Sequence, residues 1–111
     1  MDSDENKRRF NNVLVESILE GLDFGEIVLR FLELNSNLDR SQIADRPEFF
    51  AEELEKTFGP WMADMFKKNI LQLLCRKIGI NYPDIEDLTF SEAIKKAFKK
   101  YSETACLHSA L

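Results

Sequence analysis

Apolar residues recur every three or four positions along most of this chain, and that spacing restricts the fold to packed amphipathic helices. The clearest run follows Thr89 and forms one apolar stripe of Phe90, Ala93, Ile94, Ala97, Phe98 and Tyr101. Residues 27–34 are apolar enough for a strand, but their spacing fits a period of 3.6 better than a period of 2. The sequence therefore predicts an all-α fold.

Turn-forming residues divide this pattern into five helices, which a chain of 111 residues can pack as a single-domain bundle. The expected helices are residues 4–22, a second that ends near residue 35, 47–58, 60–78 and a fifth that begins after residue 89. Gly59 and Pro60 separate the third helix from the fourth, and Gly79 ends the fourth in a left-handed cap. Residues 60–78 are apolar over a wide arc, so we expect them to be the central helix. We expect residues 1–103 to form the bundle and residues 104–111 a frayed C-terminal tail.

Two helix starts carry capping patterns. Asp23 is expected to cap the second helix with Glu26 three positions later, and Thr89 to cap the last helix with Glu92. The residues expected on the inner face of the second helix are Ile27, Val28, Phe31 and Leu32.

The helix expected over residues 60–78 has a main apolar stripe that contains one amide. Its members are Met62, Met65, Phe66, Asn69, Ile70, Leu73 and Leu74. A buried Asn69 would need hydrogen-bond partners, either a neighbouring backbone carbonyl or the matching residue of a helical dimer.

The sequence contains no pattern for catalysis, for a cofactor or for a metal ion. Its single histidine, His108, lies beside Cys106 in the tail, whereas zinc sites usually need three or four ligands. The acidic residues Asp84, Glu86 and Asp87 cluster in one loop without the spacing of a calcium-binding loop. We therefore expect a protein that is not an enzyme, with no catalytic residue, cofactor or metal.

The compartment follows from two weak signals. Two cysteines, Cys75 and Cys106, are too few for a disulfide framework, which favours free thiols in a reducing compartment. No apolar run reaches the length of a membrane span, and the first ten residues have no apolar signal core. We expect a cytoplasmic protein without membrane contact.

The charge is uneven along the chain. The net charge is −5; residues 1–58 hold 14 acidic and 7 basic side chains, and residues 59–111 hold 6 and 8. A possible basic face comprises Lys95, Lys96, Lys99 and Lys100. Because no aromatic residue alternates with these lysines and the whole chain is acidic, nucleic-acid binding is the weaker interpretation.

Two other regions are candidate binding sites. Trp61, Met62 and Met65 begin the fourth expected helix and are candidates for an exposed contact patch, although all three would also fit in a core. Alternatively, a small apolar ligand or acyl chain would need a cavity between the helices, running past Phe31, Phe50, Phe66 and Phe98.

The stretch from Ala44 to Ile80 combines an Asp-Arg-Pro-Glu turn, a short acidic helix, a Phe-Gly pair and a long Ile/Leu-rich helix that ends in Lys-x-Gly. In this pattern it resembles the Nitrosopumilus-type output domain family, a group of small all-helical archaeal proteins. The matching positions are Asp45, Arg46, Pro47, Glu48, Phe50, Leu54, Phe58, Gly59, Ile70, Leu73, Leu74, Lys77 and Gly79. Residues 13–22 fit the opening helix of the family, whereas Trp61 and Met62 stand where it more often has small residues.

The resemblance implies a regulatory or signal-output module without an active site, and it transfers no catalytic residue to this chain. The leading hypothesis is therefore an archaeal, non-catalytic module that presents a helical face to a protein partner or to a second copy of itself. A homodimer fits this hypothesis because two-fold dimers are the commonest assemblies.

Overall fold

Helices dominate residues 2–109, the part of the chain that the computed structural model describes, with side chains described for residues 4–104. The elements in chain order are α1 (Asp2–Gly21), α2 (Gly25–Asn35), the 3₁₀ turn η1 (Arg40–Gln42), α3 (Pro47–Ile78), the 3₁₀ turn η2 (Tyr82–Asp84) and α4 (Phe90–Ser109). No strand occurs within residues 2–109. The prediction of an all-α fold is confirmed.

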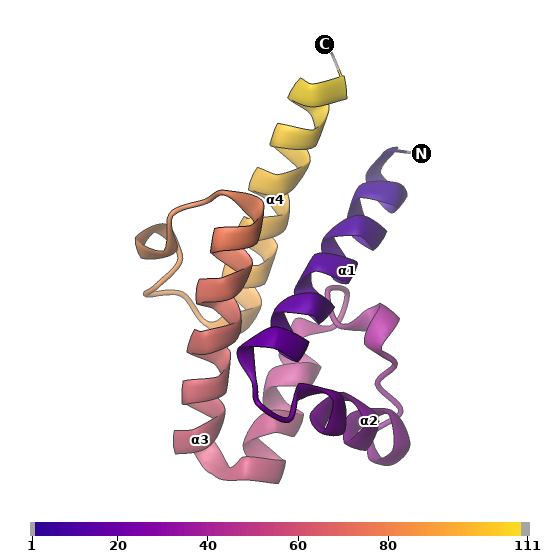
Figure 1. The fold of residues 1–111 in the computed structure, drawn as a ribbon, viewed down its shortest axis with the longest axis vertical. Helices are drawn as coiled ribbons and strands as arrows, with labels where there is room; N and C mark the ends of the chain where they lie inside the picture. The colour runs from indigo at the N-terminus through magenta and orange to yellow at the C-terminus, as the bar shows by residue number, and fades with distance from the viewer. Residues whose placement is uncertain (1, 110–111) are drawn as a thin grey trace.

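The number of helices differs from the prediction, because residues 47–78 form the single helix α3 where two helices were expected. The expected break is present as a sharp kink at Gly59, whose φ of 84° and ψ of 160° are not helical. Glycine adopts this left-handed φ without a steric penalty, and Pro60 has the fixed φ that suits the first turn after the kink. The kink therefore joins the two halves of α3 directly, with no loop between them (Figure 1).

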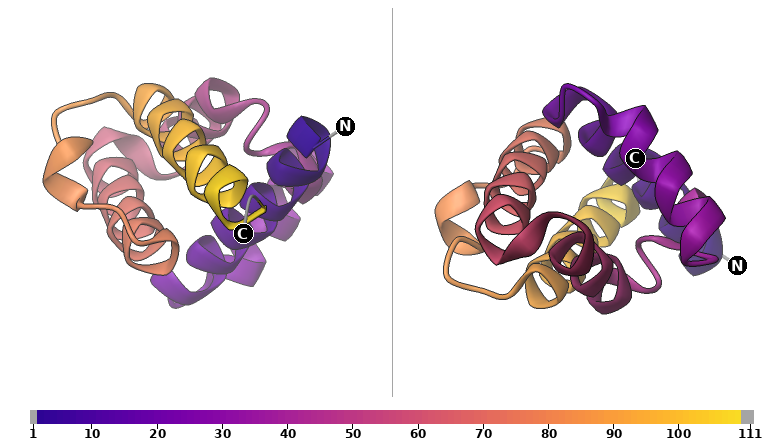
Figure 2. Two further views of the ribbon diagram at one scale, coloured as in Figure 1. Left: turned by 90° about the horizontal axis from the view of Figure 1, so that it is seen from above. Right: turned by 90° about the horizontal axis from the view of Figure 1, so that it is seen from below.

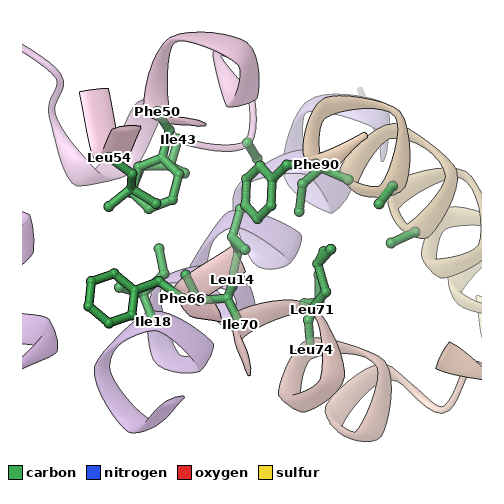
Figure 3. Packing of buried hydrophobic residues seen from close by; sticks show 14 of the residues in the cluster. Leu14, Ile18, Ile43, Phe50, Leu54, Phe66, Ile70, Leu71, Leu74 and Phe90 are labelled. Atoms are coloured by element: carbon green, nitrogen blue, oxygen red, sulfur yellow. The ribbon is translucent and has the colours of Figure 1, made fainter. Parts of the chain in front are cut away.

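The helices pack around α3, which contacts both α1 and α4. In Figure 1, α1 and α4 run side by side, and the start of α1 and the end of α4 lie at the end of the molecule away from α2 and the kink in α3. Figure 3 shows the core, in which Leu14 and Ile18 of α1 meet Phe50 and Leu54 of the first half of α3 and residues of its second half. This is a compact bundle with a radius of gyration of 13.6 Å.

The predicted stripe of α4 faces this core. Phe90, Ala93, Ile94 and Ala97 are buried, and Phe98 is half-buried. The ring centroid of Phe10 in α1 lies 5.4 Å from that of Phe98 and 5.7 Å from that of Tyr101, in tilted geometries that aromatic pairs favour. The stripe therefore joins α4 to α1.

Two of the three helix-end predictions are confirmed. The Thr89 backbone N–H donates to Glu92 Oε1 over 3.1 Å and the Glu92 N–H donates to Thr89 Oγ1 over 3.2 Å, which is a reciprocal capping box. Gly79 ends α3 in the left-handed region with φ of 75°, and its N–H donates to the carbonyl of Cys75 over 2.9 Å.

The third prediction, a cap from Asp23, is wrong. The residue before α2 is Phe24, and no side chain caps that helix. The start of α2 is positioned instead by close packing on α1: a Cβ atom at Gly25 would lie 2.5 Å from the carbonyl oxygen of Ile18. Glycine is needed here because no other residue allows so close an approach.

The stripe predicted for the second half of α3 is also displaced. Asn69, Met62 and Met65 are exposed and Leu73 is half-buried. The residues that this half buries are Ala63, Phe66, Ile70, Leu71, Leu74 and Cys75. The buried face is rotated away from Asn69, so its expected hydrogen bond in the core of this chain is wrong, and its contact in a helical dimer stays a prediction.

Helix α4 continues to Ser109, beyond the start of the predicted tail at residue 104. Residues 110–111, and the side chains of 105–111 with Cys106 and His108 among them, lie outside the described residues. None of the helices described has the length and apolar character that crossing a bilayer requires.

Candidate interaction surface

Helix α2 is apolar on two sides. Its inner face, Gly25, Val28, Leu29 and Leu32, is buried against the rest of the protein. Its outer side carries Ile27 and Leu34, which are 70% and 77% exposed, and Phe31, which is 43% exposed. The predicted inner face was therefore half wrong, because Ile27 and Phe31 point outward while Leu29 faces in.

The outer residues form one line along α2. Phe24, at the N-cap, is 38% exposed and is followed by Ile27, Phe31 and Leu34 at intervals of three, four and three residues. Residues at this spacing lie on one side of a helix, and the same alternation of three and four is the seam of a coiled coil. α2 has 11 residues and an apolar row on each of two sides. It can turn only one of these rows toward the core of the protein.

A second group of apolar side chains lies just after the kink of α3. Trp61 is 74% exposed, Met62 39% and Met65 44%. All three are exposed, so the alternative interpretation of them as core residues is wrong. The kink and α2 lie at the same end of the molecule, which Figure 2 shows from below in its right-hand view.

Phe24 packs against the phenylalanines on either side of the kink in α3. Its ring centroid lies 5.6 Å from that of Phe66 in an edge-to-face geometry and 6.2 Å from that of Phe58. Phe58 and Phe66 form a further edge-to-face pair at 5.2 Å, and Phe66 lies one turn from Met62. We call the resulting set the apolar surface; it comprises Phe24, Ile27, Phe31, Leu34, Trp61, Met62 and Met65.

The apolar surface has two parts. If a large apolar side chain offers about 200 Å², Phe24, Ile27, Phe31 and Leu34 expose on the order of 450 Å², and Trp61, Met62 and Met65 on the order of 300 Å². The largest contiguous apolar patch on a typical monomer covers about 300–600 Å² and is often functional. The seven residues therefore form the candidate site.

An ion-pair cluster ties α2 to the segment that follows it. The guanidinium of Arg40, which follows α2 in the chain, lies 2.7 Å from Glu26 and 2.9 Å from Glu33, both on α2. Hydrogen bonds from Arg40 lower the pKa of both carboxyl groups, and their hydrogen bonds raise the pKa of Arg40. Both glutamates of α2 are thus paired within the same chain.

Asn11 of α1 fixes the backbone around Arg40. Its Nδ2 donates to the carbonyl of Arg40 over 2.8 Å, and its Oδ1 accepts from the N–H of Ala44 over 2.8 Å. Asn11 is only 5% exposed, so it satisfies both backbone groups away from water. Sequence reasoning missed Asn11, whose partners lie 29 and 33 positions away, and Arg40, whose acidic partners lie 7 and 14 positions away, because partners at such separations leave no local pattern.

The predicted basic face is engaged with acidic and carbonyl groups of the same chain. The Nζ of Lys95 lies 3.0 Å from Glu48, that of Lys100 lies 3.4 Å from Asp84, and that of Lys96 donates to the carbonyl of Asp84 over 3.1 Å. Lys99 is exposed on the same helix. These contacts reduce the concentrated positive charge that a nucleic acid would need.

The remaining candidate groups lie apart from one another. Asp84, Glu86 and Asp87 are exposed, and the described side chains include no group of three or more potential ligands that could hold a metal ion. Cys75 is buried in the core, and burial raises the pKa of its thiol to about 11, which disfavours the reactive thiolate.

The four phenylalanines considered for a ligand cavity have different surroundings. Phe50 pairs with Phe90, Phe66 with Phe58, and Phe98 with Phe10. Phe31 instead borders an open surface depression of about 440 Å³ along α2, together with Ile27 and Leu34. Binding of a small apolar ligand stays a prediction.

Comparisons with protein-family models, with curated proteins and with solved structures give no match for this chain. The candidate site therefore rests on the geometry of the apolar surface.

Proposed function

We propose that this protein is a non-catalytic interaction module that binds another protein molecule through the apolar surface. The observation that carries the proposal is the exposure of seven large apolar side chains, on α2 with its N-cap residue and on the part of α3 that follows the kink. Leaving that much apolar area in water costs free energy, which a protein partner would recover by covering it.

The composition of the surface suits a helical partner. Phe24, Ile27, Phe31 and Leu34 supply a ridge at the spacing by which helices interdigitate. Trp61 supplies the kind of large anchor that dominates binding energy at interfaces, and the flexible side chains of Met62 and Met65 adapt to different shapes. The resemblance to the Nitrosopumilus-type output domain family supports a regulatory or signal-output role for this contact in an archaeal cytoplasm.

Site-specific photo-crosslinking tests this proposal. A benzophenone amino acid replaces Phe31 on the apolar surface or, as the matched control, Lys99 on the exposed side of α4. The protein is then irradiated in an extract of its source cells. We expect protein adducts from position 31 that disappear when Leu34→Asp is added, and none of these adducts from position 99.

Equal adducts from both positions, or adducts that survive Leu34→Asp, would contradict the proposal. Circular dichroism of each variant shows that the fold is intact, so that a loss of adducts reports on the surface itself.

A further inference from the structure

We propose that the molecule covering the apolar surface is a second copy of this chain, paired so that the two α2 helices run antiparallel across a two-fold axis. This inference rests on the proposed function and specifies its partner. Three independent features of α2 and its surroundings support it.

The first feature is that the α2 ridge can pack against a second copy of itself with apolar side chains on both sides. Its two most exposed residues, Ile27 and Leu34, are both apolar, and their midpoint lies between Arg30 and Phe31. In an antiparallel pair centred on that point, Ile27 of each copy faces Leu34 of the other, and the two Phe31 side chains lie next to the axis. A two-fold interface requires a surface that complements itself in this way.

The second feature is the area. The apolar surface offers on the order of 700 Å² on each copy, and stable complexes bury about 800 Å² on each partner. The α2 ridge alone supplies only about half of this area, so Trp61, Met62 and Met65 belong to the same contact. Phe24, a member of the ridge, packs against Phe58 and Phe66 on either side of the kink in α3.

The third feature is the charge around the ridge. The chain carries a net charge of −5, which opposes the approach of two identical molecules. Beside the ridge, however, Glu26 and Glu33 are already paired with Arg40 of their own chain. The positive charge of Arg30, one turn from Glu26, further lowers the pKa of that carboxyl group. Two α2 ridges can therefore approach each other without bringing Glu26 and Glu33 together as unpaired acids.

Sedimentation equilibrium of the purified protein over a range of concentrations tests the inference. The chain has a mass of 12.9 kDa, and we expect association to twice that mass. Leu34→Asp should raise the dissociation constant at least about 100-fold, because the symmetric contact receives the buried charge twice. The matched control is Gln72→Asp, which adds the same charge at an exposed position of α3 and should leave association unchanged.

A pair of charged substitutions tests the antiparallel register. Ile27→Lys alone and Leu34→Asp alone place charges against apolar side chains, and each variant should be monomeric. In the double variant Ile27→Lys with Leu34→Asp, antiparallel pairing brings the introduced lysine of each copy opposite the introduced aspartate of the other. Association should then recover at least about 10-fold over either single variant. Parallel pairing would instead bring like charges together, and the double variant would stay monomeric.

The possible outcomes separate this inference from the proposed function. A wild-type protein that is monomeric at every concentration, a dimer that tolerates Leu34→Asp, or a double variant that stays monomeric would overturn the antiparallel dimer. If photo-crosslinking from position 31 still captured a different protein in a manner sensitive to Leu34→Asp, the interaction surface would stand with another occupant. Failure of both experiments would remove the proposed function as well.

Discussion

Helices α2 and α4 differ in their outer sides and in how they begin. Each has an apolar face buried in the bundle, but the outer side of α4 carries lysines that contact Glu48 and Asp84, whereas the outer side of α2 carries Ile27 and Leu34. α4 begins in a reciprocal capping box, and α2 begins without any side-chain cap.

The difference indicates how each helix is stabilised. α4 has its start capped, and Lys95, Lys96 and Lys100 on its outer side contact groups of the same chain. α2 depends on close backbone packing at Gly25, on the ion pairs of Arg40 and, as we propose, on a partner that covers its outer ridge. Substitutions on the two helices therefore test this comparison.

The largest expected difference is in unfolding free energy, between two variants that each replace a branched aliphatic residue by alanine. Ile94→Ala on α4 removes a side chain that is 1% exposed, and we expect it to lower the free energy of unfolding by about 2–5 kcal/mol. Leu34→Ala on α2 removes one that is 77% exposed, and in the monomer it should change that free energy by no more than about 0.5 kcal/mol. Urea denaturation at low protein concentration measures both values, and similar losses for the two variants would contradict the structure of α2.

The packing of α2 on α1 is tested by Gly25→Ala. The added methyl group would lie 2.5 Å from the carbonyl oxygen of Ile18, so α2 must move outward. We expect a loss of about 1–3 kcal/mol in unfolding free energy. Gly21→Ala is a suitable control, because its Cβ would approach no atom of the neighbouring helices closer than 3.6 Å. Equal stability of the two variants would show that α1 and α2 are further apart.

Substitutions at the starts of α4 and α2 should differ by a smaller amount in their effect on stability. Thr89→Ala removes the hydroxyl that caps α4 and should cost about 1 kcal/mol in unfolding free energy. Asp23→Ala removes the side chain that a simple capping pattern assigns to α2, but this carboxylate caps nothing in the structure, so the melting temperature should hardly change. A larger loss for Asp23→Ala than for Thr89→Ala would reverse the comparison.

The smallest expected effect is the change in stability with pH that Glu26 and Glu33 cause. The pKa values of Glu26 and Glu33 lie below their ordinary value of 4.5 because Arg40 hydrogen-bonds to both. Their contribution to stability is therefore fully present above pH 4.5 and is lost as the pH falls through the lowered pKa values of the folded protein. We expect Arg40→Gln to melt slightly below the wild-type protein at pH 7, and the gap to close below pH 4.5.

Lys95→Gln is the corresponding control on α4, since it removes one exposed ion pair with Glu48. A gap for Arg40→Gln that stayed constant from pH 7 to about pH 3 would show that the guanidinium acts by packing rather than by charge.

Several features were determined by the amino-acid sequence alone. The helical period of residues 90–101 placed the inner face of α4, and Thr89 with Glu92 placed its start, because both signals depend only on neighbours within about one turn. Gly59 and Gly79 marked the kink and the end of α3 for the same reason: their left-handed φ angles are local properties. The exposure of Trp61, Met62 and Met65 was open, since an apolar residue suits either a core or a contact surface.

Only the tertiary structure decided which apolar face of α2 is buried. Two sides of this helix are similarly apolar, and the neighbouring helices cover one of them. The same holds for Asn69, which the rotation of α3 turns to solvent, and for Asn11, whose partners lie in a distant part of the chain. Helix periods and caps are local and can be read along the chain, whereas the choice between equivalent faces depends on which surfaces meet in the folded bundle.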